Sequence, residues 1–129
     1  ANIITGNGVA NRLAGGLGAD QLSGAGGADS FLFFSVKDSG KKASARDTIL
    51  DFTPGDIIDL SAIDAKKGGS DNPFKFIGKD AFDGNKGELR FQKAKGDVVV
   101  SGDVNGDAKA DFSILLDSLN KVAKGDFVL

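Results

Sequence analysis

The amino acids most often used in catalysis are missing from this 129-residue chain, which contains neither cysteine nor histidine. Without cysteine, disulfide bonds and thiolate metal sites are excluded. Without histidine, the commonest general base and the usual zinc ligand are excluded as well. We therefore expect that this chain is not itself an enzyme.

Tryptophan and tyrosine are absent too, and glutamate occurs once, as Glu88. The other seventeen acidic residues are all aspartate, and the chain has nineteen glycines and ten phenylalanines. Aspartate is a poor helix former that prefers turns and caps. The composition therefore predicts an all-β protein in which Asp/Gly turns join the strands and can take a metal ion.

Long apolar runs are lacking, and so is a strong excess of either charge. Since no run of eighteen apolar residues occurs and no signal peptide is recognisable, we expect neither membrane insertion nor use of the general secretory route. The net charge is −2, and the lysines are scattered without a basic stripe. Nucleic acid is therefore not an expected partner.

Residues 6–32 carry one nine-residue pattern three times. The clearest copy, at residues 15–23, reads GGLGADQLS; the copy at 24–32 has one glycine off pattern, and the copy at 6–14 is weaker. Each copy has glycines for a tight turn, Asn or Asp at its sixth position and an apolar residue at its eighth. The pattern is similar to the G-G-x-G-x-D-x-U-x repeat that binds calcium in repeats-in-toxin (RTX) proteins. A flexible Gly-rich linker is the alternative, and the strict period argues against it.

The repeats offer oxygen ligands of the kind that Ca²⁺ prefers over softer metals. The glycines allow a turn that aims backbone carbonyls inward, and the sixth position adds a side-chain oxygen. The candidate ligands in the three repeats are Gly6, Gly8, Asn11, Gly15, Gly16, Gly18, Asp20, Gly24, Gly26, Gly27 and Asp29.

The similarity to RTX repeats implies a parallel β-roll, in which two repeats make one turn and a calcium ion lies between repeats n and n+2. Asn11 then pairs with Asp29, eighteen residues further on. Adding eighteen residues to Asp20 gives Asp38, which stays in phase although the glycines have gone. We predict that Asp38 is the ligand that completes the roll; an ordinary turn aspartate is the alternative.

Beyond the repeats, residues 47–61 resemble the D-x-I-x-D-F…G-x-D-x-I-D-L-S segment in the C-terminal domain of serralysin-type proteases. A similar segment occurs in mannuronan epimerase R-modules. The resemblance to the serralysins continues through residues 76–91 and 102–112 to the end of the chain. It implies that Asp47 joins Asp38 in closing the last calcium site of the roll.

The same resemblance implies a domain organisation. Residues 1–37 are expected to form a parallel β-roll of nonapeptide calcium-binding repeats, and residues 38–129 a β-sandwich-like C-terminal cap that carries the secretion signal. Within this cap, alternating apolar residues predict strands near 74–76, 89–91 and 98–100. A loop is predicted at 68–72.

A second candidate calcium site is the loop at residues 103–111, which reads DVNGDAKAD. Its oxygen side chains at loop positions 1, 3, 5 and 9 match the first half of an EF-hand cage, but Ala108 replaces the expected glycine and Ile114 the bidentate glutamate. The alternative is a β-hairpin whose Asx side chains cap their own backbone. The candidate ligands are Asp103, Asn105, Asp107, the Lys109 carbonyl and Asp111.

The end of the chain resembles the C-terminus of type I secretion substrates, and a closing β-strand is a compatible alternative. The resemblances together imply a calcium-binding C-terminal module of a secreted, extracellular bacterial protein. Its expected cofactor is Ca²⁺, and its expected partners are a type I exporter and an upstream catalytic domain. The candidate secretion signal is Asp126, Phe127, Val128 and Leu129.

Two other functions fit the same resemblances. The chain could be a fragment of a secreted metalloprotease, whose zinc-binding H-E-x-x-H helix must lie elsewhere because the chain has no histidine. It could also be a carbohydrate- or surface-binding R-module of an extracellular polysaccharide-modifying enzyme. The lack of tryptophan and tyrosine argues against an aromatic platform for sugar in that case.

Overall fold

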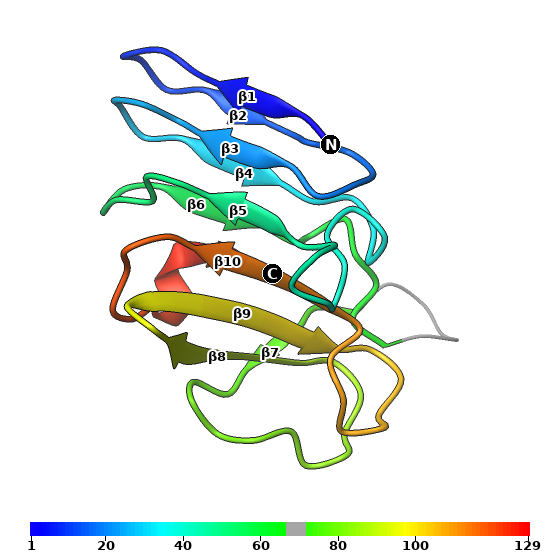
Figure 1. Cartoon of the computed structure of the whole chain (residues 1–129). Helices are drawn as coiled ribbons and strands as arrows, with labels where there is room; N and C mark the ends of the chain where they lie inside the picture. The colour runs from blue at the N-terminus through cyan, green and yellow to red at the C-terminus, as the bar shows by residue number, and fades with distance from the viewer. Residues whose placement is uncertain (67–71) are drawn as a thin grey trace.

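The computed structural model describes residues 1–66 and 72–129, and within them the strands form two sheets (Figure 1). The predicted loop at 68–72 falls almost entirely outside the described residues. The seven-stranded sheet has the order β1 (Ile3–Thr5), β3 (Gln21–Ser23), β5 (Asp47–Ile49), β10 (Phe112–Leu116), β9 (Asp97–Asp103), β8 (Glu88–Ala94) and β7 (Lys75–Phe76). The four-stranded sheet has the order β11 (Phe127–Val128), β6 (Ile57–Asp59), β4 (Ser30–Leu32) and β2 (Arg12–Leu13).

The first six strands stack as a parallel β-roll of three layers, which confirms the predicted fold class. β1 and β2 form the first layer, β3 and β4 the second, and β5 and β6 the third (Figure 1). Between the first two layers the register advances by eighteen residues, since Arg12 lies opposite Ser30. The third layer continues this stacking past residue 37, with Ile57 opposite Ser30.

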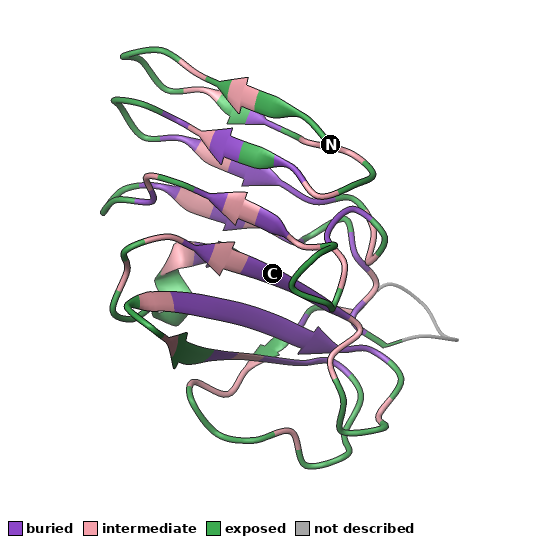
Figure 2. Ribbon diagram, in the orientation of Figure 1, coloured by how far each residue is buried: buried purple, intermediate pink, exposed green. Residues whose placement is uncertain are grey.

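The interior of the roll is filled by the apolar residue that follows each Asn or Asp by two positions. Because side chains alternate between the faces of a strand, this position points inward whenever the Asn or Asp ends the preceding turn. Burial of one such side chain contributes about 1.5–3 kcal/mol. The inner positions are Leu13, Leu22, Phe31, Ile49 and Ile58, all of which are buried. Figure 2 shows such buried residues along the strands of the roll.

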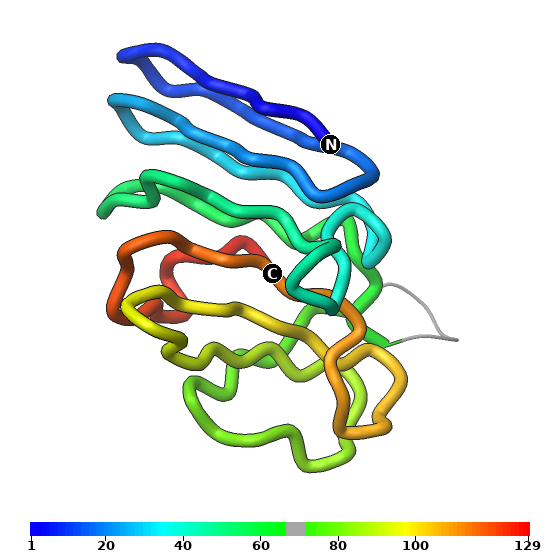
Figure 3. Tube along the Cα trace, in the orientation of Figure 1, coloured from blue at the N-terminus to red at the C-terminus, as the bar shows by residue number. Residues whose placement is uncertain are grey.

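The remaining strands extend the roll into a cap. β10 pairs with β5 in parallel, and β9 and β8 follow as antiparallel neighbours. β11 closes the second sheet beside β6, directly after the 3₁₀ helix η1 (Lys124–Asp126). The trace in Figure 3 shows that the N-terminus lies at the open end of the roll, whereas the C-terminus returns to the level of β10. The alternation that predicted strands at β7, β8 and β9 is confirmed.

A long excursion separates the second layer from the third. Residues 33–46 leave the roll after β4 and return at β5. The Ser39 hydroxyl joins this excursion to the cap, because it donates to the Ser113 carbonyl and accepts the Asp47 N–H at 2.7 Å. In the described parts of the chain, no helix has the length and apolar character needed to cross a membrane.

Candidate calcium sites

The Asn and Asp residues that end the turns lie above one another in two columns, one on each side of the roll. Each column is a ladder, in which the main-chain N–H of one member donates to the side-chain Oδ1 of the member one layer on. The first column consists of Asn2, Asp20 and Asp47. The second column consists of Asn11, Asp29 and Asp56.

The first column is held by two short bonds. The Asn2 N–H donates to Asp20 Oδ1 at 2.6 Å, and the Asp20 N–H donates to Asp47 Oδ1 at 2.8 Å. The predicted pairing of Asp20 with Asp38 is therefore wrong in register. The residue one layer on from Asp20 is Asp47, twenty-seven residues away, because the excursion at 33–46 adds nine residues to this turn.

Asp38 lies in that excursion, where it closes a local turn. Its Oδ2 accepts the Phe34 N–H at 2.8 Å, and its Oδ1 accepts the Ser35 hydroxyl at 3.1 Å. Asp38 is nevertheless buried and close enough to Asp47 for its negative charge to act there. The structure thus brings Asp20, Asp38 and Asp47 to one place, with Asp47 rather than Asp38 in the ladder.

The second column follows the same geometry. The Asn11 N–H donates to Asp29 Oδ1 at 2.8 Å, so the predicted pair lies in adjacent layers. The Asp29 N–H donates to Asp56 Oδ1 at 2.9 Å. Asp56 is not among the predicted ligands, although the sequence carries a signal for it, since the apolar Ile58 follows it by two positions as Leu22 follows Asp20.

Three carboxylates in these columns have one oxygen locked in the ladder and one oxygen without a partner. Asp20, Asp29 and Asp47 are at most 1% exposed. Their Oδ2 atoms are buried and accept no hydrogen bond from the described residues. A buried charged oxygen without a partner is costly unless a cation compensates it. This hard-oxygen donor set fits Ca²⁺.

The two ends of the second column differ from its middle. Asp56 Oδ2 accepts the Thr53 N–H at 2.9 Å, so both oxygens of this carboxylate have protein partners. Asn11 Oδ1 accepts the Asn7 N–H at 2.8 Å, and the Asn11 amide donates to Asn7 Oδ1 at 3.2 Å. The unpartnered oxygen of this column therefore belongs to Asp29.

The first glycine of each repeat is required because the ligand side chain folds back over it. A Cβ at Gly15 would lie 2.4 Å from Asp20 Oδ2, and a Cβ at Gly24 would lie 2.0 Å from Asp29 Oδ2. In the weaker first repeat, a Cβ at Gly6 would meet the Asn11 side chain. At Gly15 and Gly24, the side chain of any other residue would occupy the space beside the unpartnered Oδ2 of the ligand carboxylate.

The later glycines shape the turns. Gly16 and Gly18 have φ values of +78° and +127°, which side chains rarely adopt. In the third repeat, Gly27 has φ +95°, and Ala25 takes φ +65° at the position where the pattern has glycine. This left-handed alanine costs about 1 kcal/mol. The two remaining glycines of the predicted set, Gly8 and Gly26, face each other, since a Cβ added at Gly26 would lie 3.5 Å from the Gly8 Cα.

Asp47 is the carboxylate most strongly affected by its surroundings. Burial raises the pKa of Asp47 from the ordinary value of 3.8 to about 7. The hydrogen bond from the Asp20 N–H opposes this rise, and the negative charges of Asp20 and Asp38 add to it. Without a metal ion, the negative charges of Asp20 and Asp38 therefore disfavour ionisation of the buried Asp47.

Asp51 stabilises the turn at the start of the third repeat, and both of its carboxylate oxygens have hydrogen-bond partners. Its carboxylate accepts the N–H groups of Gly24 and Ala25, both at 2.9 Å, and the Ser23 hydroxyl at 2.6 Å. Burial would raise the pKa of Asp51, but these hydrogen bonds outweigh it and hold the pKa below its usual value. Asp51 is not among the residues predicted for the site.

The loop at 103–111 is the predicted hairpin between β9 and β10, and its three carboxylates converge. Oxygens of Asp103, Asp107 and Asp111 lie within 4.8 Å of one another. Unlike the roll carboxylates, those of Asp103 and Asp111 are fully engaged. Asp103 accepts three backbone N–H groups of the loop at 2.8–3.2 Å, and Asp111 accepts the Val104 N–H and the Asn105 amide.

Asp107 and Lys109 lie on the exposed side of this loop, where Asp107 Oδ1 accepts the Lys109 N–H at 3.0 Å. Ala108 adopts φ +62° at the position where an EF-hand has glycine. These hydrogen bonds match the alternative in which the Asx side chains cap their own backbone. Calcium binding by this loop stays a prediction.

Removing the Asp103 carboxylate separates these two interpretations. Asp103→Ala is expected to lower the free energy of unfolding by about 2–3 kcal/mol, because three backbone N–H groups of the loop lose their charged, buried acceptor. Urea denaturation should show the same loss at saturating calcium and at the lowest calcium concentration that keeps the chain folded. In the control Asp107→Ala, self-capping predicts a loss below about 1 kcal/mol in both conditions; a loss confined to saturating calcium would show that the loop holds metal.

The proposed secretion signal forms the closing strand. Phe127 is buried and contacts Phe76, with ring centroids 5.5 Å apart, while Val128 is exposed. Val128 also ties the strand down, since its carbonyl accepts the Leu60 N–H at 2.9 Å. In the folded protein these residues are therefore part of the cap.

Comparison with known families identifies the chain over its whole length. The family described as Peptidase M10 serralysin C terminal matches residues 1–129. The chain belongs to this serralysin C-terminal family. The match confirms the resemblance found in the sequence, and it agrees with a non-catalytic, calcium-binding repeat domain of a kind found in secreted proteins.

Solved structures show the same fold. The R2 subunit of AlgE6, a mannuronan C5-epimerase from Azotobacter vinelandii, is 21% identical, with a TM-score of 0.63 over 100% of this chain and 87% of that chain. The R3 subunit of the same enzyme is 19% identical, with a TM-score of 0.56 over 98% of this chain and 78% of that chain. Comparison with curated protein sequences gave no match.

Proposed function

We propose that this chain is a calcium-triggered folding module at the C-terminal end of a protein that leaves the cell through a type I exporter. The observation that carries the proposal is the set of buried, unpartnered oxygens on Asp20, Asp29 and Asp47. In a metal-free roll these carboxylates repel one another, and the Gly-rich turns are costly to order. Folding and metal binding are then a single equilibrium.

The proposed role of calcium is to supply positive charge at the orphaned oxygens of the two columns. Extracellular calcium modules have dissociation constants of roughly 10⁻⁴–10⁻³ M, which lie far above the free calcium concentration of a cytosol. The roll therefore remains unfolded and able to pass through an exporter inside the cell. Outside, calcium stabilises the folded chain according to its concentration relative to the dissociation constant.

A calcium titration followed by far-UV circular dichroism tests this proposal. We expect a calcium-dependent rise in β-signal that magnesium does not reproduce, because Mg²⁺ is smaller and dehydrates reluctantly. Unchanged β-signal in chelator and in millimolar calcium would contradict folding by calcium. The repeats would then be a passive scaffold.

The export role rests on the resemblance of Asp126–Leu129 to type I secretion substrates, and the parent protein is proposed to be a secreted metalloprotease or another extracellular enzyme. Fusing the chain to a reporter in cells that carry a type I exporter tests export directly. We expect the fusion in the medium, and its retention after removal of the last four residues. Equal secretion of both fusions would exclude these residues as the signal.

A further inference from the structure

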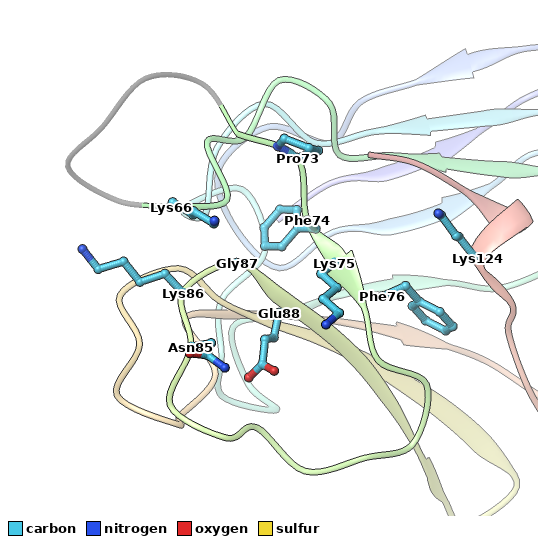
Figure 4. Close-up of a pocket in the computed structure, with 10 residues that line it drawn as sticks. All are labelled: Lys66, Pro73, Phe74, Lys75, Phe76, Asn85, Lys86, Gly87, Glu88 and Lys124. Carbon is cyan, nitrogen blue, oxygen red and sulfur yellow. The ribbon is translucent and has the colours of Figure 1, made fainter.

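A pocket of about 780 Å³ lies beside β7, at the edge of the seven-stranded sheet farthest from β1. Four lysines line it, each from a different segment of the chain, and Glu88 is the one acidic residue among the described lining residues (Figure 4). In this view Lys66 and Lys86 lie at one end, Lys124 lies at the other and Lys75 lies between them. The chain as a whole carries a charge of −2, so this pocket concentrates positive charge on an acidic protein.

These charges favour an anionic ligand with several separate negative groups. Lys66, Lys75 and Lys124 are exposed, whereas Glu88 is 4% exposed and bonded to the Asp83 N–H at 3.0 Å. Lysine presents a compact point charge on a flexible stem, in contrast to the planar fork with which arginine grips one carboxylate or phosphate. Lysines spread along a pocket suit carboxylates that are spaced along a chain.

The walls add apolar surface and an amide to these charges. Pro73, Phe74 and Phe76 line the pocket, and Asn85 supplies a hydrogen-bond donor and acceptor. The volume lies within the range of small-ligand sites, and the charged and polar side chains in the lining outnumber the apolar ones. A sugar acid has the matching chemistry, because its ring carries apolar C–H faces, hydroxyl groups and a carboxylate.

Other polyanions fit less well. β7 has only two residues and follows Pro73, and short edge strands with proline resist the addition of a peptide strand. Single-stranded nucleic acid is bound on free aromatic rings, on which its bases stack. Here Phe74 packs edge-on against Phe112 at 5.6 Å, and Phe76 stacks on Phe91 at 6.1 Å.

We propose that this pocket binds an acidic polysaccharide whose sugars carry carboxylates, with Lys66, Lys75 and Lys124 pairing with them. None of the lining residues belongs to the two calcium columns, so binding here goes beyond the calcium-dependent folding proposed above and does not require it to be correct.

Calorimetric titration of the whole chain with short oligouronates, at fixed calcium, tests the pocket. Short oligomers are used because long polyuronates gel with calcium. The triple variant Lys66→Gln, Lys75→Gln, Lys124→Gln is expected to bind at least about tenfold more weakly. The matched control Lys41→Gln, Lys42→Gln, Lys93→Gln changes the net charge equally at exposed positions outside the pocket, and it should bind within about twofold of the parent. Circular dichroism of each variant verifies that it is folded.

Three further ligands complete the test. A neutral oligosaccharide and an oligoglutamate peptide should bind at least about tenfold more weakly than the oligouronate, and a sulfated oligosaccharide no more tightly than it. Absence of oligouronate binding at millimolar concentration would overturn the proposal. So would equal loss of binding in the two triple variants, or equal binding of the peptide, which would indicate attraction by charge alone.

Discussion

Asp20→Asn is expected to raise the calcium concentration at the midpoint of folding at least about tenfold. The substituted amide keeps an oxygen that can accept the Asn2 N–H, so the ladder of the first column survives. What the substitution removes is the negative charge and the unpartnered Oδ2. In chelator the variant should be at least as stable as the parent, because a buried charge without compensation has gone.

The same substitution at Asp56 is the matched control. Asp56 is the last ladder carboxylate of the second column, where it holds the place that Asp47 has in the first, but its two oxygens accept the N–H groups of Asp29 and Thr53. Asp56→Asn should therefore leave the calcium midpoint within about twofold of the parent value, while it lowers stability in calcium and in chelator alike. Calcium titrations followed by circular dichroism measure both midpoints. If both variants shift the midpoint equally, the orphaned oxygens do not define the calcium sites.

Sequence periodicity predicted the roll because it records the part of the structure that repeats. Gly15 leaves space for a side chain, Asp20 supplies a ladder oxygen and Leu22 fills the core. Their spacing follows from one turn and one short strand per repeat. The parallel layers and the inner face were therefore predictable without any knowledge of the rest of the chain.

Periodicity could not place the third layer, because the excursion at 33–46 lengthens the turn by one full repeat of nine residues and so leaves the nine-residue period unbroken. Asp38 and Asp47 both follow Asp20 by a multiple of nine residues, so spacing alone does not distinguish them. The residue two positions on does: Gly40 follows Asp38, whereas Ile49 follows Asp47 and is fully buried. A core residue is needed wherever the roll adds a layer, and this requirement decides the register.

Contacts between distant segments were also beyond the reach of the sequence. Asp51 braces a turn twenty-six or twenty-seven residues earlier, and the lysines of the β7 pocket come from four segments that meet only in the folded cap. No regular spacing in the sequence predicts either arrangement. For the loop at 103–111, in contrast, the sequence suggested a site that the contacts do not require. Its composition matches a metal cage, but its hydrogen bonds already satisfy the carboxylates of Asp103 and Asp111.

In the absence of calcium, the protein is expected to lose stability as the pH rises from about 4 to 7. The pKa of Asp47 is about 7 in the folded chain and has the ordinary value of 3.8 when the chain is unfolded. Between these values the folded state holds a proton that the unfolded state has released, so the free energy of unfolding falls with rising pH. At about 1.4 kcal/mol for each unit of pKa, the upper limit of this loss is roughly 4 kcal/mol.

Saturating calcium should remove this dependence, because Asp47 is ionised as a ligand and is already ionised in the unfolded chain at these pH values. Binding to the folded chain must displace the Asp47 proton, so the calcium dissociation constant of the folded chain should fall by up to about tenfold for each pH unit up to 7 and level off above it. Both slopes are measured at pH 5 and pH 8, the first by urea denaturation in chelator with a stabilising osmolyte that keeps the chain folded, and the second by calcium titrations. Asp47→Asn retains the acceptor for the Asp20 N–H and should flatten the slope in chelator. A slope that persists unchanged in this variant would assign the pH dependence to other carboxylates.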